Sequence, residues 1–293
     1  MDARDPLGCR DPSVERTVLQ SGKRLVLLLN KIDLIPRENA QEWLKYLRQE
    51  FPTIPFRSST QLQRENLSTY TSEGCCAGVS EVLSLLKNYC RTDSTSSSLK
   101  LSITVGVVGM PSVGKSSFIN SLKRQKACQV GANAGTTRSL QLVSLDRNIR
   151  LLDSPGIIWQ TTAGSKRQLL RNATTSTSHE PEEIADAILS HCNYALLAKI
   201  YAIPEDSMML SETAANRSQE LLVKLAQHLG MMKRGALLDL QAAANRLACD
   251  WNSGKIPFYS TVPSAAERRA AFEEESQVVF GGQLAEPFHL MEQ

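Results

Sequence analysis

The first half of the chain alternates short apolar runs with longer segments of mixed polarity. The runs at residues 25–29 and 103–108 are almost continuously apolar or small, which is typical of strands buried on both faces of a parallel sheet. The segments between them repeat apolar residues at helical spacing and predict amphipathic helices. The predicted helices span residues 13–20, 36–50 and 79–89, and the other predicted strands span 54–57, 140–145 and 149–152. The short gap between the last two strands predicts an antiparallel pair.

The pattern changes near residue 180, where strand-like runs stop. Apolar residues then recur only with the helical period, which predicts helices from Pro181 onward and over residues 193–201, 211–229 and 239–251. A chain of 293 residues has room for two domains. We predict an α/β domain over residues 1–160, a flexible connection over 161–178, a smaller all-helical domain over 179–262 and a charged, disordered tail over 263–293.

Positive charge is concentrated in the middle of the chain. Residues 100–178 hold eleven Lys and Arg but only two Asp and Glu, although the net charge of the whole chain is only +3. This imbalance indicates an anionic partner, such as a nucleotide or RNA, while a solvated basic face explains it equally well. The candidate RNA contacts are Lys123, Arg124 and Lys126 in the middle of the chain and Arg246 and Lys255 in the helical region.

Cysteine usage and hydropathy narrow the class of protein. The seven cysteines are an odd number and form no C-x-x-C pair, so we expect a reduced intracellular protein without a zinc site. The longest apolar runs are too short to span a bilayer, and no membrane partner is expected.

The segment from Gly109 to Ser116 fits G-x-x-x-x-G-K-S, the pattern of a phosphate-binding loop between a strand and a helix. Glycines allow the backbone N–H groups to turn toward a phosphate. Lys115 supplies a positive charge to the β- and γ-phosphates, and the Ser116 hydroxyl is a ligand for Mg²⁺. A Gly-rich turn with an incidental lysine is the alternative, but the flanking strand and amphipathic helix favour the phosphate site. The expected nucleotide contacts are Gly109, Pro111, Ser112, Val113, Gly114, Lys115, Ser116 and Ser117.

The segment Asn30-Lys31-Ile32-Asp33 follows the strand at 25–29 and fits N-K-x-D. The Asp33 carboxylate can accept from the ring N–H and the exocyclic amine of guanine, a donor pair that adenine lacks. Asn30 can meet the ring edge and tie this loop to the phosphate loop, and the Lys31 stem can lie over the base. A helix-capping aspartate is the alternative for this motif alone. The phosphate loop in the same chain favours guanine recognition.

Two further segments complete the predicted site. Ser58 and Ser59 follow the strand at 54–57 and are candidates for contacting the base, although such hydroxyl residues more often form an ordinary loop. Asp153-Ser154-Pro155-Gly156 fits D-x-x-G, which places Asp153 on a Mg²⁺-bound water and the Gly156 N–H on the γ-phosphate. In the polar loop at 131–138 we assign Thr137 to the Mg²⁺ shell, with Thr136 as the alternative. The predicted catalytic residues are Lys115, Thr137 and Gly156, and the predicted metal ligands are Ser116, Thr137 and Asp153.

The motifs occur in a rotated order, because the guanine motif precedes the phosphate loop instead of following D-x-x-G. A doubly wound, mostly parallel sheet tolerates this rotation, since ligands bind at the carboxyl ends of the strands whatever the connections. The sequence resembles the circularly permuted GTPases of the nucleostemin type, the guanine nucleotide-binding protein-like 3 group. The resemblance covers residues 2 to about 260 and rests on D-A-R-D-P-L-G, L-V-L-L-L-N-K-I-D-L-I-P, V-G-K-S-S-x-I-N-S-L-K-R, L-L-D-S-P-G and D-W-N-S-G-K-I-P-F-Y.

This resemblance implies a circularly permuted P-loop GTPase domain that binds GTP or GDP with Mg²⁺ and hydrolyses GTP slowly. It also implies a nuclear protein located in the nucleolus, a role in large ribosomal subunit assembly, and a helical domain that helps bind ribosomal RNA. The expected partners are therefore ribosomal RNA or the pre-60S particle, and the sequence identifies no nuclear protein partner. We expect a monomer.

Four features depart from the family pattern. The family has an apolar strand before D-A-R-D-P and a basic N-terminal targeting segment before that strand. The sequence starts at D-A-R-D-P, so we expect either a sheet with one strand fewer or a piece of a longer protein. Ser112 stands where the family has an asparagine that can help hold potassium, and the shorter serine argues against potassium stimulation. Ala134 stands where the family usually has proline.

The residue after D-x-x-G predicts slow catalysis. It is Ile157, where many GTPases have a glutamine that orients the attacking water, and an apolar side chain cannot do so. We predict a slow GTPase that acts as an assembly switch and depends on a partner, a cation or the ribosomal particle for activation. The alternative is a nucleotide-gated scaffold with negligible hydrolysis. A P-loop kinase or ATPase is disfavoured because N-K-x-D and D-x-x-G both occur at strand ends.

The motif order also predicts a route of communication. The predicted γ-phosphate contacts Thr137 and Gly156 lie just before the helical region, with about 25 residues after Gly156 in between. We therefore expect GTP and GDP to place residues 180–260 differently and to change RNA affinity. A loose segment at 160–178 that transmits nothing is the alternative.

Overall fold

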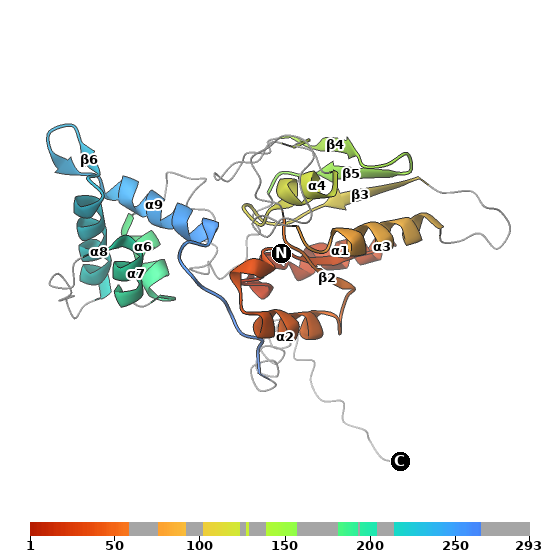
Figure 1. Cartoon of the computed structure of the whole chain (residues 1–293), viewed down its shortest axis with the longest axis horizontal. Helices are drawn as coiled ribbons and strands as arrows, with labels where there is room; N and C mark the ends of the chain where they lie inside the picture. Colours follow the sequence, from red (N-terminus) through yellow and green to blue (C-terminus); the bar gives the residue numbers. More distant parts are fainter. Residues whose placement is uncertain are drawn as a thin grey trace, which may run out of the picture. The chain divides into compact units, whose positions relative to one another are not determined.

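The computed structural model describes residues 1–58, 76–91, 102–123, 127–128, 139–156, 181–192, 194–203 and 214–264 (Figure 1). Residues Met1–Ser260 form one compact unit, which contains every element considered below. Two short 3-10 turns, η1 (Leu7–Cys9) and η2 (Ile32–Leu34), flank the first helix and strand. None of the helices in the described ranges is long and apolar enough to cross a membrane.

The first two strands form a parallel pair joined by a helix. β1 (Leu27–Leu29) lies beside β2 (Thr53–Pro55), and α2 (Arg37–Leu47) makes the crossover between them with Trp43 buried. The predicted strand over 54–57 ends earlier than expected, because Arg57 turns away and exchanges backbone hydrogen bonds of 3.1 Å with Ala77.

α1 (Pro12–Gln20) precedes this pair and confirms the helix predicted over 13–20. Pro12 occupies the first turn, where its missing N–H leaves no hydrogen bond unmade. The Asp11 carboxylate accepts from the Ser13 N–H at 2.7 Å and caps the helix.

A second group of strands carries the phosphate loop. β3 (Ile103–Val107), β4 (Gln141–Ser144) and β5 (Ile149–Asp153) are arranged in the order β3-β5-β4. β3 is parallel to β5 with Val107 opposite Asp153, and β4 is antiparallel to β5, which confirms the predicted pair. Because β3 and β5 end at the same edge, the loops that follow them meet there.

One apolar core lies between these strand groups and their helices. α3 (Val79–Arg91) and α4 (Lys115–Lys123) pack against it, and Phe56 of the first group meets Phe118 of α4 edge to face, with ring centroids 4.9 Å apart. The buried members are Phe56, Val82, Leu86, Cys90, Phe118, Ile119, Leu122, Cys128, Val143, Ile149 and Leu151. In this α/β part of the chain the described strands lie in two hydrogen-bonded groups, β1-β2 and β3-β5-β4, which refines the predicted doubly wound sheet.

The chain start runs beside the end of β1. The Asn30 N–H donates to the Met1 carbonyl at 2.9 Å, and the Ala3 N–H donates to the Asn30 carbonyl at 2.8 Å. Residues 1–3 therefore continue the parallel pairing at the carboxyl end of β1, next to the guanine motif.

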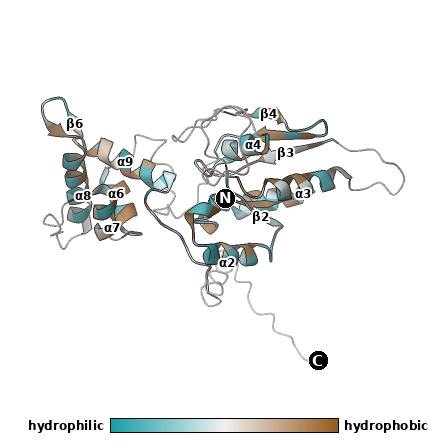
Figure 2. Ribbon diagram, viewed as in Figure 1, coloured by the Kyte–Doolittle hydropathy of each residue, from teal (hydrophilic) through white to brown (hydrophobic). Residues whose placement is uncertain are grey.

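The C-terminal part of the unit is built from four helices with their own core. They are α6 (Pro181–Leu189), α7 (Tyr194–Tyr201), α8 (Ala214–His228) and α9 (Leu240–Ser253). Ile188, Leu197, Leu225 and Leu247 are fully buried among them. Figure 2 shows hydrophobic and hydrophilic residues alternating along α8, as expected for a helix that packs with one face.

The prediction that this region is entirely helical was wrong in one detail. β6 (Met232–Lys233) and β7 (Leu237–Leu238) form a short antiparallel hairpin between α8 and α9. Gly235 and Ala236 have φ of 91° and 59°, and these left-handed residues close its turn. Two-residue strands are too short to leave a period in the sequence, so pattern reasoning could not find them.

Candidate functional site

The phosphate loop, Gly109–Ser116, connects the end of β3 to the start of α4. Gly114 has φ of 94°, and a Cβ at this position would lie only 2.4 Å from the Asn30 Nδ2 atom. Glycine is therefore required both by the backbone conformation and by the close approach of the guanine motif. Ser112 also adopts a left-handed conformation, with φ of 59°, which is uncommon for residues other than glycine.

The Lys115 ammonium folds back over this loop. Its Nζ atom donates to the Gly109 carbonyl at 2.9 Å and to the Met110 carbonyl at 2.8 Å. Burial lowers the pKa of Lys115 to about 8, and the nearby negative charge of Asp153 opposes this effect. A buried cation that donates to two neutral carbonyls favours an anion at this position, as a nucleotide phosphate would be.

The Asp153 carboxylate lies beside the phosphate loop at the end of β5. It is fully buried, and its Oδ2 atom accepts from the Ser116 hydroxyl at 2.8 Å. Its Oδ1 atom is buried without a hydrogen-bond partner among the residues that the structure describes. Burial, and next the charge of Asp153, raise the pKa of the nearby Cys128 thiol to about 12, so this thiol stays protonated.

These oxygens fit the magnesium ion that the motifs predict. An ionised carboxylate with one open oxygen and an adjacent hydroxyl are hard donors of the kind that Mg²⁺ prefers. Within the described ranges no three acidic, histidine or cysteine residues gather into a site that could hold a metal ion. Mg²⁺ usually binds one or two protein carboxylates and completes its shell with phosphates and water.

The D-x-x-G segment packs directly on the phosphate loop. A Cβ at Gly156 would lie 2.8 Å from the Pro111 Cα atom, so any larger residue would push the two loops apart. The Ser154 hydroxyl donates to the Val107 carbonyl at 2.7 Å, which fastens this segment to the end of β3. The Gly156 backbone is thereby held at the edge of the phosphate loop.

The guanine loop, Asn30–Asp33, is tied to the phosphate loop by one side chain. The Asn30 amide donates from Nδ2 to the Val113 carbonyl at 2.8 Å, and its Oδ1 atom accepts from the Ser58 hydroxyl at 3.1 Å. Ser58 thus orients Asn30. Lys31 has φ of 63°, a left-handed conformation that is uncommon for residues other than glycine.

Asp33 has a neighbour that sequence reasoning missed. The Arg57 Nε atom lies 3.9 Å from the Asp33 Oδ2 atom, and both side chains are about one-third exposed. Arg57 comes from the end of β2, which parallel pairing places beside the end of β1. Arg57 therefore places a positive charge beside the carboxylate that is predicted to accept from guanine.

The structure brings most of the predicted site residues together, from 30–33, 58, 109–117 and 153–156. Ser59, Thr136, Thr137 and Ile157 lie outside the described residues, as does the segment 157–180 on which the predicted communication route depends.

The predicted RNA contacts fare differently. Lys123 ends α4, while Arg124 and Lys126 are not among the described residues. The Arg246 Nε and Lys255 Nζ atoms both pair with the Asp250 Oδ2 atom, at 3.0 and 3.3 Å. Their charges are partly neutralised, which weakens the case for these two as phosphate contacts.

Comparisons with known proteins agree with this arrangement. A family model described as "50S ribosome-binding GTPase" matches residues 104–224. The chain is 44% identical over 291 residues to the guanine nucleotide-binding protein-like 3 homolog of Caenorhabditis elegans, covering 95% of this chain and 50% of that protein. It is 43% identical to guanine nucleotide-binding protein-like NSN1 of Arabidopsis thaliana, covering 100% and 50%, and 38% identical to human guanine nucleotide-binding protein-like 3, covering 90% and 48%. The chain thus spans about half the length of these relatives.

Solved structures show the same fold. GDP-bound YlqF matches with a TM-score of 0.51 at 22% identity, covering 89% of this chain and 91% of that one. GNP-bound YlqF from T. maritima matches with a TM-score of 0.51 at 20% identity, covering 87% and 86%. The fold is that of the circularly permuted GTPases, and the resemblance drawn from the motifs is confirmed.

Proposed function

We propose that this chain, a circularly permuted GTPase related to the guanine nucleotide-binding protein-like 3 proteins, works as a slow GTP-driven switch in the assembly of the large ribosomal subunit. One observation supports it most directly. The three nucleotide motifs, which the rotated order separates along the chain, meet at one place because Asn30 bonds to the phosphate loop and Gly156 packs on it. The description of the matching family as ribosome-binding supports the ribosomal partner.

Each motif has one task in binding GTP. Asp33 accepts the two guanine donors, the N–H groups of the phosphate loop and Lys115 bind the β- and γ-phosphates, and the Gly156 N–H donates to the γ-phosphate. Ser116 and Asp153 would hold Mg²⁺, whose positive charge neutralises the phosphates. We retain Thr137 as the third metal ligand and assign Ser59 to the base side, in the loop that follows Ser58.

Hydrolysis by the free protein is slow in this proposal. Ile157 has no polar group that could orient the attacking water, so the rate depends on a group supplied by a partner. Electrostatic and positioning groups dominate phosphoryl transfer, and an added one can raise the rate by a factor of about 10³–10⁵. The large-subunit precursor is the proposed source of that group, with Ser112 arguing against potassium.

A nucleotide-gated scaffold with negligible hydrolysis is the competing function. Single-turnover hydrolysis of bound GTP separates the two, measured with and without pre-60S particles. A switch predicts a rate that rises at least about tenfold with particles. Lys115→Ala is the negative control, because any hydrolysis that particles show with this variant comes from the particles themselves. An unchanged rate would favour the scaffold.

The proposed partner is ribosomal RNA within the pre-60S particle. We propose that the protein is a monomer and meets this particle in the nucleolus. Residues 179–262 are the proposed RNA-contacting domain, together with the basic segment that begins at Lys123. Phosphate contacts predict RNA affinity that falls steeply between low and physiological salt. RNA affinity that survives Lys123→Glu combined with Arg124→Glu would exclude this surface.

A further inference from the structure

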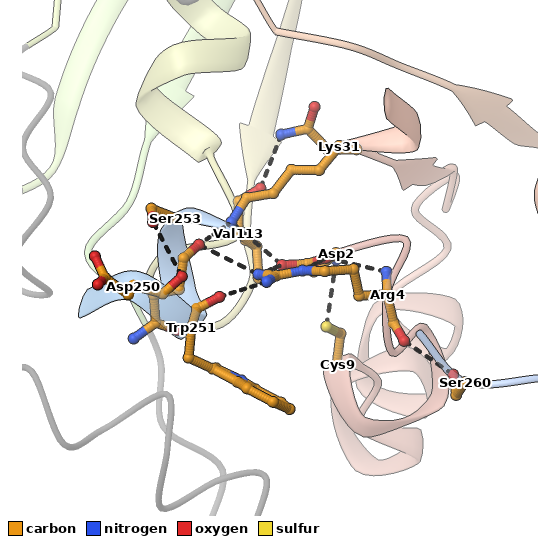
Figure 3. A network of polar contacts seen from close by, with 11 residues as sticks. Asp2, Arg4, Cys9, Lys31, Val113, Asp250, Trp251, Ser253 and Ser260 are labelled. Carbon is orange, nitrogen blue, oxygen red and sulfur yellow. Dashed lines mark hydrogen bonds and ion pairs between the residues drawn. The ribbon is translucent and has the colours of Figure 1, made fainter. Parts of the chain in front are cut away.

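The end of α9 is bound to the guanine loop through the first residues of the chain (Figure 3). The Arg4 guanidinium donates from Nη1 to the Trp251 carbonyl at 2.5 Å and from Nη2 to the Asn252 carbonyl at 3.2 Å. The last carbonyls of a helix lack partners within the helix and carry partial negative charge. Arg4 satisfies two of them, so it fixes the position of this helix end.

The Asp2 carboxylate joins Arg4 to the guanine loop. Arg4 binds it twice, from Nε to Oδ1 at 3.1 Å and from Nη2 to Oδ2 at 2.7 Å. The same Oδ2 atom lies 3.2 Å from the Lys31 Nζ atom, and this ammonium also donates to the Asn252 carbonyl at 3.3 Å. Asp2 and the end of α9 are thus shared by the two cations, Arg4 and Lys31.

The contact between the chain start and the end of α9 is buried and closely packed. Arg4 and Asp2 are both about 5% exposed, and the backbone pairing of Ala3 with Asn30 fixes their segment against the guanine loop. On the other side of the contact, Gly254 ends α9 with φ of 87°, and a Cβ there would lie 2.7 Å from the Leu34 Cδ1 atom. Leu34 directly follows the guanine loop, so the end of α9 packs closely against the residue next to this loop.

We propose that Asp2 and Arg4 are positioning residues for guanine recognition, which hold the Lys31 ammonium at the end of α9 and so couple the binding of the base to the docking of the helical region. The Lys31 stem that covers the base is anchored at its tip by these contacts. Binding of the base favours the anchored conformation of Lys31, and the anchored conformation favours a docked α9. By linkage, docking of α9 strengthens nucleotide binding by the same factor by which the nucleotide favours docking, so displacing α9 weakens nucleotide binding.

This route differs from the one that the motif order predicts. It starts at the base, which GTP and GDP share, so it distinguishes nucleotide-bound from empty protein and treats the two nucleotides alike. The proposal rests on guanine-nucleotide binding, which is part of the proposed function, and not on ribosome assembly. A protein that binds GDP but ignores pre-60S particles would contradict the proposed function and leave this proposal intact.

A double-mutant cycle on GDP affinity tests the positioning role. Arg4→Gln removes the charged guanidinium but leaves a polar side chain, and Lys31→Met removes the ammonium but keeps the apolar stem. We expect each single variant to weaken GDP binding about tenfold, as expected for losing one charge-assisted hydrogen bond. In the Lys31→Met background, Arg4→Gln should cost no more than roughly twofold, because its effect passes through Lys31. Two independent tenfold losses that multiply would overturn the proposal.

Arg10→Gln is the matched control. Arg10 also lies in the N-terminal segment and also binds carboxylates at short range, Glu15 at 2.6 Å and Glu50 at 2.7 Å. The bonds of Arg10 to Glu15 and Glu50 do not involve Lys31. We expect GDP affinity to remain within twofold of wild type, roughly the error of such titrations. A tenfold loss here would show that any weakened N-terminal segment impairs binding, which would contradict a specific role for Arg4.

Hydrogen exchange in the unchanged chain gives a second test, which holds even if a variant fails to fold. The Gly254 and Lys255 N–H groups donate to the Trp251 and Asp250 carbonyls at 3.2 and 3.0 Å, so their exchange reports on the end of α9. We expect GDP to slow exchange over residues 250–256 as well as in the phosphate loop. Slower exchange in the phosphate loop alone would overturn the coupling.

Discussion

The two ends of the nucleotide site differ in how far the protein completes them by itself. At the phosphate end, Lys115 donates to two loop carbonyls and burial lowers its pKa, while one oxygen of Asp153 has no hydrogen-bond partner among the described residues. At the base end, Asn30 is bonded on both sides of its amide and Lys31 is held by Asp2. The phosphate end therefore depends on charges that the nucleotide brings, and the base end is organised in advance by the fold.

The largest expected effect comes from the phosphate end. Lys115→Ala removes the cation that balances the phosphates, and GTP affinity should fall by about 100-fold or more, the scale of a buried charge-assisted contact. Isothermal titration with Mg²⁺ measures this. Lys123→Ala, at the other end of α4, should leave affinity unchanged. If both variants bind alike, the loop is not the phosphate site.

Base selection should respond next. Asp33→Asn replaces an acceptor of two hydrogen bonds by a group with only one acceptor, so GTP affinity should fall by roughly 10- to 100-fold while xanthosine triphosphate gains. Competition between the two nucleotides measures the preference. Asp11→Asn is the control, because asparagine also caps helices well and the charge change is the same. An unchanged preference in Asp33→Asn would place guanine recognition elsewhere.

The lowered pKa of Lys115 predicts proton uptake on binding. In the free protein this pKa is about 8, and an adjacent phosphate raises it again by favouring the charged form. Below about pH 7 the lysine is charged in both states and binding takes up no proton. Above pH 8 the free lysine is increasingly neutral, so binding must add a proton, and affinity should fall by up to about tenfold per pH unit.

Titrations in two buffers of different ionisation enthalpy detect this proton. Lys115→Arg is the control, because a guanidinium stays charged over the whole range. Proton uptake that persists in Lys115→Arg would assign the effect to another group.

The smallest effect concerns Ser112 in the phosphate loop. Asparagine tolerates the left-handed conformation of this position better than serine, so Ser112→Asn should stabilise the fold by roughly 0.5 kcal/mol, a fraction of the 1–2 kcal/mol that this conformation costs. Urea unfolding measures the change. Ser112→Val should do the reverse, since a branched side chain is strained there. Equal midpoints for the two variants would show that the loop relaxes out of this conformation.

The sequence was most informative where the chemistry is local. The strands at 25–29 and 103–108, the phosphate loop and the antiparallel pair could all be predicted, because each depends on residues within one short segment. The contact of Arg57 with Asp33 could not, because it requires knowing that β1 and β2 are paired.

The same limit explains what was missed in the helical region. The sequence indicates Asp2 and Arg4 only as part of a family motif, since the Arg4 partners at 251 and 252 lie almost the whole chain away. Arg246 and Lys255 read as free cations in the sequence, and only packing reveals that both share Asp250.

Arg4 binds residues 251, 252 and 260. These contacts determine when, during its synthesis, the protein can first bind nucleotide tightly. The Ser260 N–H donates to the Arg4 carbonyl at 2.8 Å, so the first and last elements of the unit close on each other. Folding proceeds from the N-terminus as the chain emerges. Asp2 and the phosphate loop are thus translated early, while the α9 carbonyl that also binds Lys31 arrives only with the last residues of α9. A nascent chain that ends before residue 250 should therefore hold guanine nucleotide weakly, and tight binding should appear once residue 260 has left the exit tunnel.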